Sequence, residues 1–207
     1  MQMKKAEEKT LGYYNKHAKE WGEAHHGFEE ESFWKDWMQK LHNLLSEGKI
    51  LEVGSGTGKD ASNLIKLGYD YTGTDASQGL LKIAQERNPN AVFKNIKAQD
   101  LHKLFGTDEF DCFWSAATLL HIPKDEINAT LQSIHAVVKD GGIGFISIKQ
   151  GEGEQEDETG RLFSYYSQEE FAELLKENGF EVIEKDIQPM SEKTIWLVYL
   201  IKIRKEI

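Results

Sequence analysis

The residues with the most evident chemistry lie in a glycine-rich turn in the N-terminal half of the chain. Residues 49–60, KILEVGSGTGKD, form a short apolar run followed by glycines at positions 54, 56 and 58. Such a run predicts a buried parallel strand, and the residues after the last glycine predict a helix. Glycines let the backbone approach a ligand with no Cβ in the way, and the N-terminus of the next helix offers free N–H groups. We therefore expect a nucleotide-type pocket at this turn.

The spacing of these glycines separates the turn from two common phosphate-binding loops. A dinucleotide fingerprint reads G-x-G-x-x-G, whereas here the third glycine comes one residue early. The expected strand also brings Glu52 to the loop, where a carboxylate would repel a pyrophosphate but suit a ligand with an ammonium or sulfonium charge. A Walker A loop is excluded, because no Gly-Lys-Ser/Thr follows at its spacing.

The stretch ILEVGSGTGKD resembles motif I of the class I S-adenosylmethionine-dependent methyltransferases. The resemblance covers residues 49–207 and implies that later strand ends complete a site for S-adenosylmethionine. It implies that Glu52 organises the loop or the methionine ammonium, since stronger stabilisation of the sulfonium in the ground state would hinder the reaction. The expected cofactor contacts are Glu52, Gly54, Ser55, Gly56, Thr57, Gly58, Asp75, Ala76, Gln99, Asp100, Leu101, Trp114 and Ser115.

Asp75 ends the second expected strand, YDYTGTD. In nucleotide-binding α/β folds, an acid at this position accepts hydrogen bonds from both ribose hydroxyls. Asp75 or Ser77 could instead cap the helix that follows. We favour ribose binding, because the glycine loop precedes it.

Asp100 follows the third expected strand, AVFKNI. The resemblance implies that Asp100 accepts the adenine amino group, with Gln99 and Leu101 beside the ring. The alternative is that Asp100 is an ordinary loop acid or cap.

The fourth expected strand, FDCFWSA, ends beside the point where the strand order of such sheets reverses, which is where ligands bind. Trp114 and Ser115 should emerge at this edge, and His121 follows in the loop. His121 could deprotonate a hydroxyl, thiol or amine near neutral pH, or it could pack against the cofactor or cap backbone groups. The loop is similar to that of small-molecule methyltransferases. It lacks the Asn/Asp-Pro-Pro-Tyr signature, which counts against nucleic acid and glutamine acceptors.

Two further segments could contact the acceptor. The resemblance implies that an N-terminal cap and the insertion after the fifth strand close over the site. The cap residues could equally be core aromatics, and a metal site at His17, His25 and His26 is disfavoured because no motif fixes an acid beside them. The expected acceptor contacts are Tyr13, Tyr14, Trp21, Arg161, Tyr165 and Tyr166.

The elements that must position these residues predict an α/β fold in one domain, 1–207. Residues 1–48 form a helical cap whose helix 29–45 carries an apolar stripe with Trp34 and Trp37. Residues 49–207 alternate strands and helices, which predicts a doubly wound, Rossmann-like sheet of seven mostly parallel strands. The resemblance implies that the last strand is reversed. Residues 150–166 read as a flexible loop, and Ser167–Glu170 as a capping box.

Composition limits the partners. A net charge of -10 with no basic patch disfavours nucleic acid, and one cysteine excludes a disulfide framework or a cysteine-rich zinc site. With no signal-like or membrane-spanning apolar stretch, we expect a cytoplasmic protein with no membrane partner, as a monomer or homodimer.

The function that the resemblance implies is methyl transfer from S-adenosylmethionine to a small-molecule acceptor by in-line displacement, giving S-adenosylhomocysteine and needing no metal. Aligning nucleophile, methyl group and sulfur would supply most of the catalysis. Two alternatives remain: a protein or RNA methyltransferase, and a sensor domain that binds the cofactor without turnover. The aromatic cap favours an enclosed small acceptor, either planar or held as a cation on ring faces.

Overall fold

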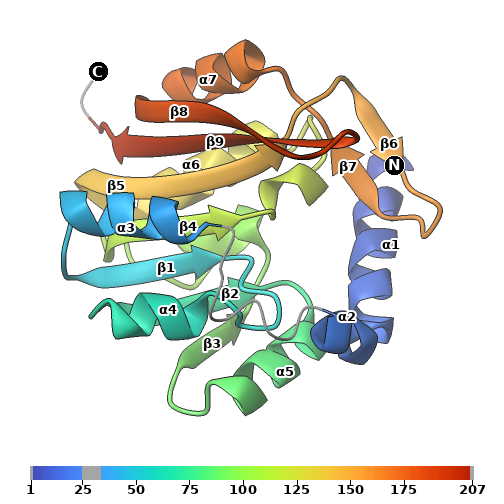
Figure 1. Ribbon diagram of the computed structural model, residues 1–207, viewed down its shortest axis with the longest axis horizontal. Coiled ribbons are helices and arrows are strands. Elements are labelled where there is room, and N and C mark those ends of the chain that lie inside the picture. The colour runs from blue at the N-terminus through green and yellow to red at the C-terminus, as the bar shows by residue number, and fades with distance from the viewer. Residues whose placement is uncertain (1, 25–33, 206–207) are drawn as a thin grey trace.

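The computed structural model describes residues 2–24 and 34–205 and contains one seven-stranded sheet with helices on both faces (Figure 1). The strand order is β3-β2-β1-β4-β5-β9-β8, and β9 alone runs antiparallel to the other six strands. This confirms the expected sheet with a reversed last strand. The strands are β1 (Lys49–Val53), β2 (Asp70–Asp75), β3 (Val92–Asn95), β4 (Phe110–Ala116), β5 (Val138–Lys149), β8 (Phe180–Ser191) and β9 (Thr194–Ile203).

The helices separate into a cap and two layers. Helices α1 and α2 precede the sheet, α3 and α4 pack on one face, and α6 and α7 pack on the other. The helical elements are α1 (Gln2–Lys16), α2 (Ala18–Ala24), α3 (Lys35–Leu44), α4 (Ala61–Lys66), α5 (Gln78–Arg87), α6 (Ile127–Val137), α7 (Gln168–Glu177) and the 3-10 turns η1 (Ala98–Lys103) and η2 (Leu119–His121). No helix among them is both long and apolar enough to cross a bilayer.

Both faces of the central strands are buried, which explains their continuous apolar runs. In β1, Ile50 packs with the α3 and α4 layer, whereas Leu51 packs with the α6 and α7 layer. In β4, Cys112 and Phe113 divide between the layers in the same way. Since side chains alternate across a strand, one apolar run supplies both cores.

The structure differs from the sequence-based expectations within residues 150–166 and describes only part of one expected helix. Helix α3 begins at Lys35, and residues 29–33 of the expected helix lie outside the described part. Strand β5 begins at Val138 and has an irregular register against β4. Within residues 150–166, expected to form a flexible loop, a hairpin forms from β6 (Glu154–Glu156) and β7 (Leu162–Ser164). The expected capping box of Ser167 and Glu170 is confirmed.

Helix α1 crosses the carboxyl ends of the parallel strands and reaches from β7 to α5 (Figure 1). Its contacts with both are polar. Thr10 Oγ1 accepts a hydrogen bond from the N–H of Leu162 at 2.8 Å, and Asn15 Oδ1 accepts from Ser77 Oγ at 2.9 Å and from the N–H of Gly79 at 3.0 Å. The strand ends and this helix together enclose the space described next.

Candidate active site

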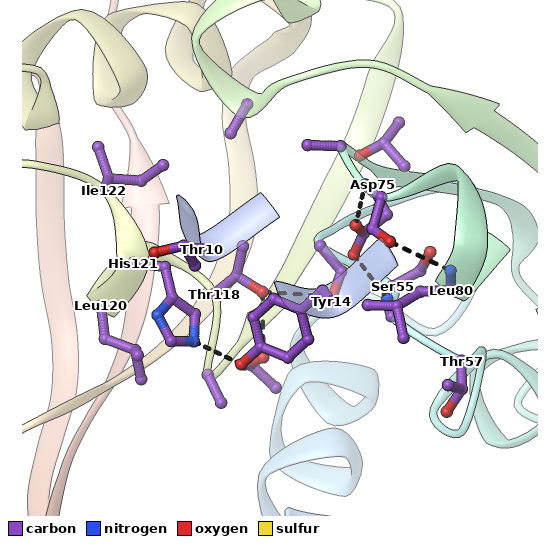
Figure 2. Close-up of a pocket in the computed structure, with 18 of the residues that line it drawn as sticks. Thr10, Tyr14, Ser55, Thr57, Asp75, Leu80, Thr118, Leu120, His121 and Ile122 are labelled. Carbon is purple, nitrogen blue, oxygen red and sulfur yellow. Dashed lines mark hydrogen bonds between the residues drawn. The ribbon is translucent and has the colours of Figure 1, made fainter. Parts of the chain in front are cut away.

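A cavity of about 610 Å³ lies where the strand order reverses, between the carboxyl ends of the strands and α1. Cavities of this size hold small organic ligands and cofactors. Figure 2 shows Asp75 on one side of it, with Tyr14 and His121 on the other. The expected site residues that line this cavity are Glu52, Gly54, Ser55, Gly56, Thr57, Asp75, Ala76, Gln99, Tyr14, Trp21, His121 and Arg161.

The three loop glycines have different surroundings, although each has a positive φ. A Cβ on Gly54 would lie 2.1 Å from Thr118 Oγ1, and one on Gly58 would lie 2.8 Å from Asn88 Nδ2. Gly56 has no atom within 4 Å of the Cβ position, so its missing side chain leaves open space. Gly58 does not line the cavity, because it packs against α5.

Asp75 and Ser77 perform separate tasks at the end of β2. Ser77 Oγ caps α5 by accepting a hydrogen bond from the N–H of Leu80 at 3.2 Å. Asp75 Oδ2 accepts from the N–H of Gly56 at 2.9 Å, and Oδ1 accepts from the N–H of Ser77 at 2.7 Å. Burial raises the pKa of Asp75, although these two backbone hydrogen bonds act in the opposite direction. The carboxylate is therefore held in a fixed orientation at the cavity wall.

Glu52 is a buried acid beneath the loop. Its carboxylate accepts a hydrogen bond from the hydroxyl of Tyr71. Burial and the nearby Asp60 raise the pKa of Glu52 well above its usual value. A positively charged ligand group beside Glu52 would offset this penalty.

The 3-10 turn after β3 brings Gln99 to the cavity, whereas Asp100 and Leu101 do not line it. The Asp100 carboxylate forms an ion pair with Lys103 at 2.6 Å, and Leu101 is fully buried in the core. The Gln99 amide donates hydrogen bonds to Glu7 and Glu126, which identifies its Nε2 end. Its Oε1 is then a buried acceptor with no partner among the described residues.

Trp114 and Ser115 also lie away from the cavity lining, because β4 still has both faces covered at these positions. The Trp114 ring stacks on Phe145 with centroids 4.0 Å apart, and its indole N–H donates to Asp60 Oδ2 at 3.1 Å. Trp114 thus contributes to the site through the position of Asp60. The residues of this edge that line the cavity are Ala116, Ala117 and Thr118.

His121 and Tyr14 form a hydrogen-bonded pair in the cavity (Figure 2). The carbonyl oxygen of Leu162 lies 2.6 Å from His121 Nδ1 and must accept from an Nδ1–H. Burial lowers the pKa of His121 to about 4, so the ring is neutral at pH 7 and Nε2 is an acceptor. Nε2 accepts from the Tyr14 hydroxyl at 2.9 Å, and Arg161 Nη1 donates to that hydroxyl at 3.3 Å.

The aromatic residues beside Arg161 point in different directions, and only some of them line the cavity. Tyr13 and Tyr14 are consecutive on α1, so they point about 100° apart and only Tyr14 lines the cavity. Tyr13 instead packs its ring 4.9 Å from Arg161 Cζ. After β7, Tyr166 is buried in the core, and Tyr165 packs beside Phe163 without lining the cavity.

Several lining residues were not anticipated from the sequence, notably Glu7, Thr118, Lys149 and Trp196. Lys149 ends β5 and Trp196 lies beside it on β9. The signal available for Lys149 was its position at the carboxyl end of a predicted parallel strand. Trp196 reads as an ordinary core residue of a terminal strand, so nothing in its own segment marks it as part of the site.

The expectation about metal chemistry concerned His17, His25 and His26. The last two lie outside the described residues. Within 2–24 and 34–205, no group of three or more His, Cys, Asp or Glu residues is placed to hold a metal ion.

Comparison with known proteins supplies the family. Residues 50–142 match the model of a family described as a methyltransferase domain. An uncharacterized protein of Methanocaldococcus jannaschii is 30% identical over 165 residues, which cover 75% of each chain. A ubiquinone biosynthesis O-methyltransferase of Bordetella avium is 28% identical over 116 residues, or 54% of this chain and 47% of that enzyme.

Among solved structures, the 1,6-didemethyltoxoflavin N1-methyltransferase of Burkholderia thailandensis has the same fold. Its crystal structure contains 1,6-didemethyltoxoflavin and S-adenosylhomocysteine. The TM-score is 0.73 at 22% identity, and the match covers 88% of this chain and 83% of that one. The chain spans about half the length of most curated methyltransferases that it matches. With the glycine loop, the sheet order and these matches, the chain belongs to the class I S-adenosylmethionine-dependent methyltransferases.

Proposed function

We propose that this protein transfers a methyl group from S-adenosylmethionine to a small-molecule acceptor held in the same cavity. The observation that carries the proposal is the continuity of one cavity from Asp75 and the glycine loop to Tyr14 and His121. Helix α1 crosses over the cavity, whose size suits small ligands. The relatives named above act on different atoms, oxygen in one and nitrogen in the other, so they leave the acceptor atom open.

The lining residues fit the cofactor. Asp75 presents a fixed carboxylate, the geometry that binds two vicinal ribose hydroxyls. Gly56 leaves open space at the loop, and Ser55 Oγ is buried with no partner among the described residues. Gln99 Oε1 is a second such acceptor, which we assign to the adenine amino group in place of Asp100. The ammonium of the methionine part would offset the cost of burying the Glu52 carboxylate.

The bound cofactor supplies an electrophilic methyl group on its sulfonium, and the chain must orient the acceptor and receive its proton. Tyr14 and His121 are placed to receive this proton. The acceptor proton passes to Tyr14 Oη while Tyr14 passes its own proton to His121 Nε2. Arg161 stabilises negative charge on the Tyr14 oxygen during this exchange, and the Leu162 carbonyl keeps the histidine in the required tautomer.

Calorimetric titration with S-adenosylmethionine and S-adenosylhomocysteine tests the proposal, on the wild type and on Asp75→Ala. We expect binding in the micromolar range, weakened by about 1 to 3 kcal/mol in Asp75→Ala, because hydrogen bonds to a charged acceptor are lost. Asp100→Ala is the matched control, since it removes a neighbouring acid that does not line the cavity. It should bind like the wild type.

Absence of binding by folded wild-type protein would refute the proposal. Tight binding with no turnover against a broad acceptor panel would instead support a cofactor sensor. A turnover assay that follows S-adenosylhomocysteine release separates these outcomes, because every acceptor that is methylated yields this same product.

A further inference from the structure

The cavity has a second charged end, formed by Lys149 at the tip of β5. In the sheet order, β1 and β4 separate Asp75 on β2 from Lys149 on β5. Three strand spacings correspond to roughly 14 Å, so the two groups face different parts of any bound ligands. Tyr14 and His121 also line this cavity. If Asp75 holds the ribose, the Lys149 end is left for the acceptor.

Lys149 carries a charge that nothing in the described part of the chain neutralises by direct contact. No carboxylate or carbonyl there forms an ion pair or hydrogen bond with its ammonium. Its neighbours are rings instead, with Nζ 4.5 Å from the centroid of Phe163 and 5.8 Å from that of Trp196. Burial and the nearby Arg161 lower the pKa of Lys149. An anion at this position would remove the cost of keeping the ammonium partly desolvated.

Several other charges of the cavity are already engaged. Asp157, beside this end, binds Arg161 through Nη2 at 2.7 Å and Nε at 3.0 Å. Glu7 forms an ion pair with Lys97 at 2.8 Å. The Asp75 carboxylate is held by backbone N–H groups at the opposite end. Lys149 is therefore the cation available to a ligand at this end of the cavity, whereas Arg161 is paired with Asp157 and holds Tyr14. Lys59 also lines the cavity, but it follows the glycine loop at the other end.

The walls around Lys149 are flat and apolar. Phe163 and Trp196 line the cavity with Trp34, whose ring meets that of Trp196 edge to face at 5.4 Å. The indole N–H of Trp196 is buried and has no hydrogen-bond partner among the described residues. Aromatic walls with one cation and a spare donor suit a planar ring that carries an anionic oxygen.

We propose that the acceptor is a small aromatic anion whose charged oxygen binds the Lys149 ammonium and whose ring packs against Phe163 and Trp196. This assignment rests on the proposed function and narrows its acceptor class. It also favours a planar anion over a cation at this end, because the Lys149 ammonium beside the Phe163 and Trp196 rings would repel a cation there.

The test measures binding at saturating S-adenosylhomocysteine, by calorimetry or by tryptophan fluorescence. The probes are benzoate, salicylate, 1-naphthoate and indole-3-acetate, each paired with its primary amide, which has nearly the same shape without the charge. We expect the wild type to bind at least one carboxylate about tenfold more tightly than its amide, a difference that corresponds to about 1.4 kcal/mol.

Three variants test whether the preference for the carboxylate over the amide depends on the charge of Lys149. Lys149→Met keeps the length and apolar stem of the side chain but removes the charge, and it should abolish the preference for the carboxylate. Lys149→Arg should retain most of it. Lys103→Met is the matched control, since it changes the net charge equally at an exposed site outside the cavity, and it should behave like the wild type. Unchanged S-adenosylhomocysteine affinity in all three variants would show that the fold is intact.

Three results would overturn the assignment. These are equal binding of every carboxylate and its amide by the wild type, preferential binding of the amides, and a carboxylate preference that survives in Lys149→Met as fully as in Lys103→Met. Each leaves the proposed function standing if S-adenosylhomocysteine still binds. Failure of the wild type to bind S-adenosylhomocysteine would refute the proposed function itself and this assignment with it.

Discussion

At the scale of single residues, each glycine of the loop is needed for a separate reason. Gly54 must have no side chain because Thr118 fills the space, and Gly58 because α5 packs against it. Gly56 alone of the three borders open space within the cavity. Substitution by alanine therefore separates packing from ligand access.

We expect Gly56→Ala to fold with a loss of about 1 kcal/mol, the usual cost of placing a Cβ at positive φ, here +53°. Its methyl group enters ligand space, so affinity for S-adenosylhomocysteine should fall about tenfold or more. Gly54→Ala should lose considerably more stability. Denaturant unfolding and calorimetry measure both effects.

Gly153→Ala is the control for Gly56→Ala, because Gly153 also has positive φ and open surroundings but lies outside the cavity. It should lose a similar amount of stability and no affinity. If Gly56→Ala bound the ligand as tightly as Gly153→Ala, the loop would not be the cofactor site.

His121 makes stability depend on pH, because its folded pKa of about 4 lies below the usual 6.5. Between these values the unfolded chain binds a proton that the folded chain excludes, so stability is lost as the pH falls. From pH 7 to pH 5 this loss is about 2 kcal/mol. His121→Gln should therefore lose about that much less stability than the wild type over this range in urea unfolding.

His17→Gln serves as the comparison, since it removes an imidazole that lies between α1 and α2 and does not line the cavity. It should keep the acid sensitivity of the wild type. An His121→Gln variant as acid-sensitive as the wild type would mean that the histidine is not held neutral by burial.

At the scale of elements, α1 is docked through side-chain hydrogen bonds to β7 and to the start of α5. Asn15 bridges α1 to the start of α5 through Ser77 and Gly79. Asn15→Ala should weaken this docking by about 0.5 to 1.5 kcal/mol, because the partly buried Ser77 hydroxyl and the Gly79 N–H lose their acceptor. Hydrogen exchange of the α1 amides should accelerate accordingly, with the exchange of β1 and β4 unchanged.

Lys9→Ala provides the contrast on the same helix. It removes an exposed ion pair with Glu156, and such pairs contribute less than about 1 kcal/mol. Its exchange should stay close to that of the wild type. If Lys9→Ala opened α1 as much as Asn15→Ala did, surface charge would hold the cap instead of the Asn15 bridge.

The difference between local patterns and tertiary packing explains what the sequence could predict. The strands and the capping box at Ser167 follow from local patterns, so sequence was sufficient for them. Ser115 and Trp114 were misplaced because periodicity does not show where β4 becomes uncovered. The position of Lys149 at the end of a parallel strand was readable from the sequence, but its contact with Phe163 and Trp196 arises through tertiary packing across distant segments and has no local signal.

At the scale of the whole molecule, the cavity is formed by three parts of the chain. Asp75 and the glycine loop come from one side of the switch point, His121 and Lys149 from the other, and Tyr14 from the cap. A ligand that contacts all three parts must stabilise them together. Binding should therefore appear as an increase in global stability.

At S-adenosylhomocysteine concentrations of 100 times the dissociation constant, linkage gives about 2.7 kcal/mol of stabilisation. For a chain of this size, 1 kcal/mol raises the melting temperature by roughly 2 to 4 °C, so we expect an increase of about 5 to 10 °C. Asp75→Ala, at the same ligand concentration, should show a smaller increase because its affinity is lower. Scanning calorimetry with and without ligand measures both. An increase in Asp75→Ala equal to that in the wild type would show that the ligand does not bind at Asp75, and the proposed cofactor orientation in the cavity would then have to be abandoned.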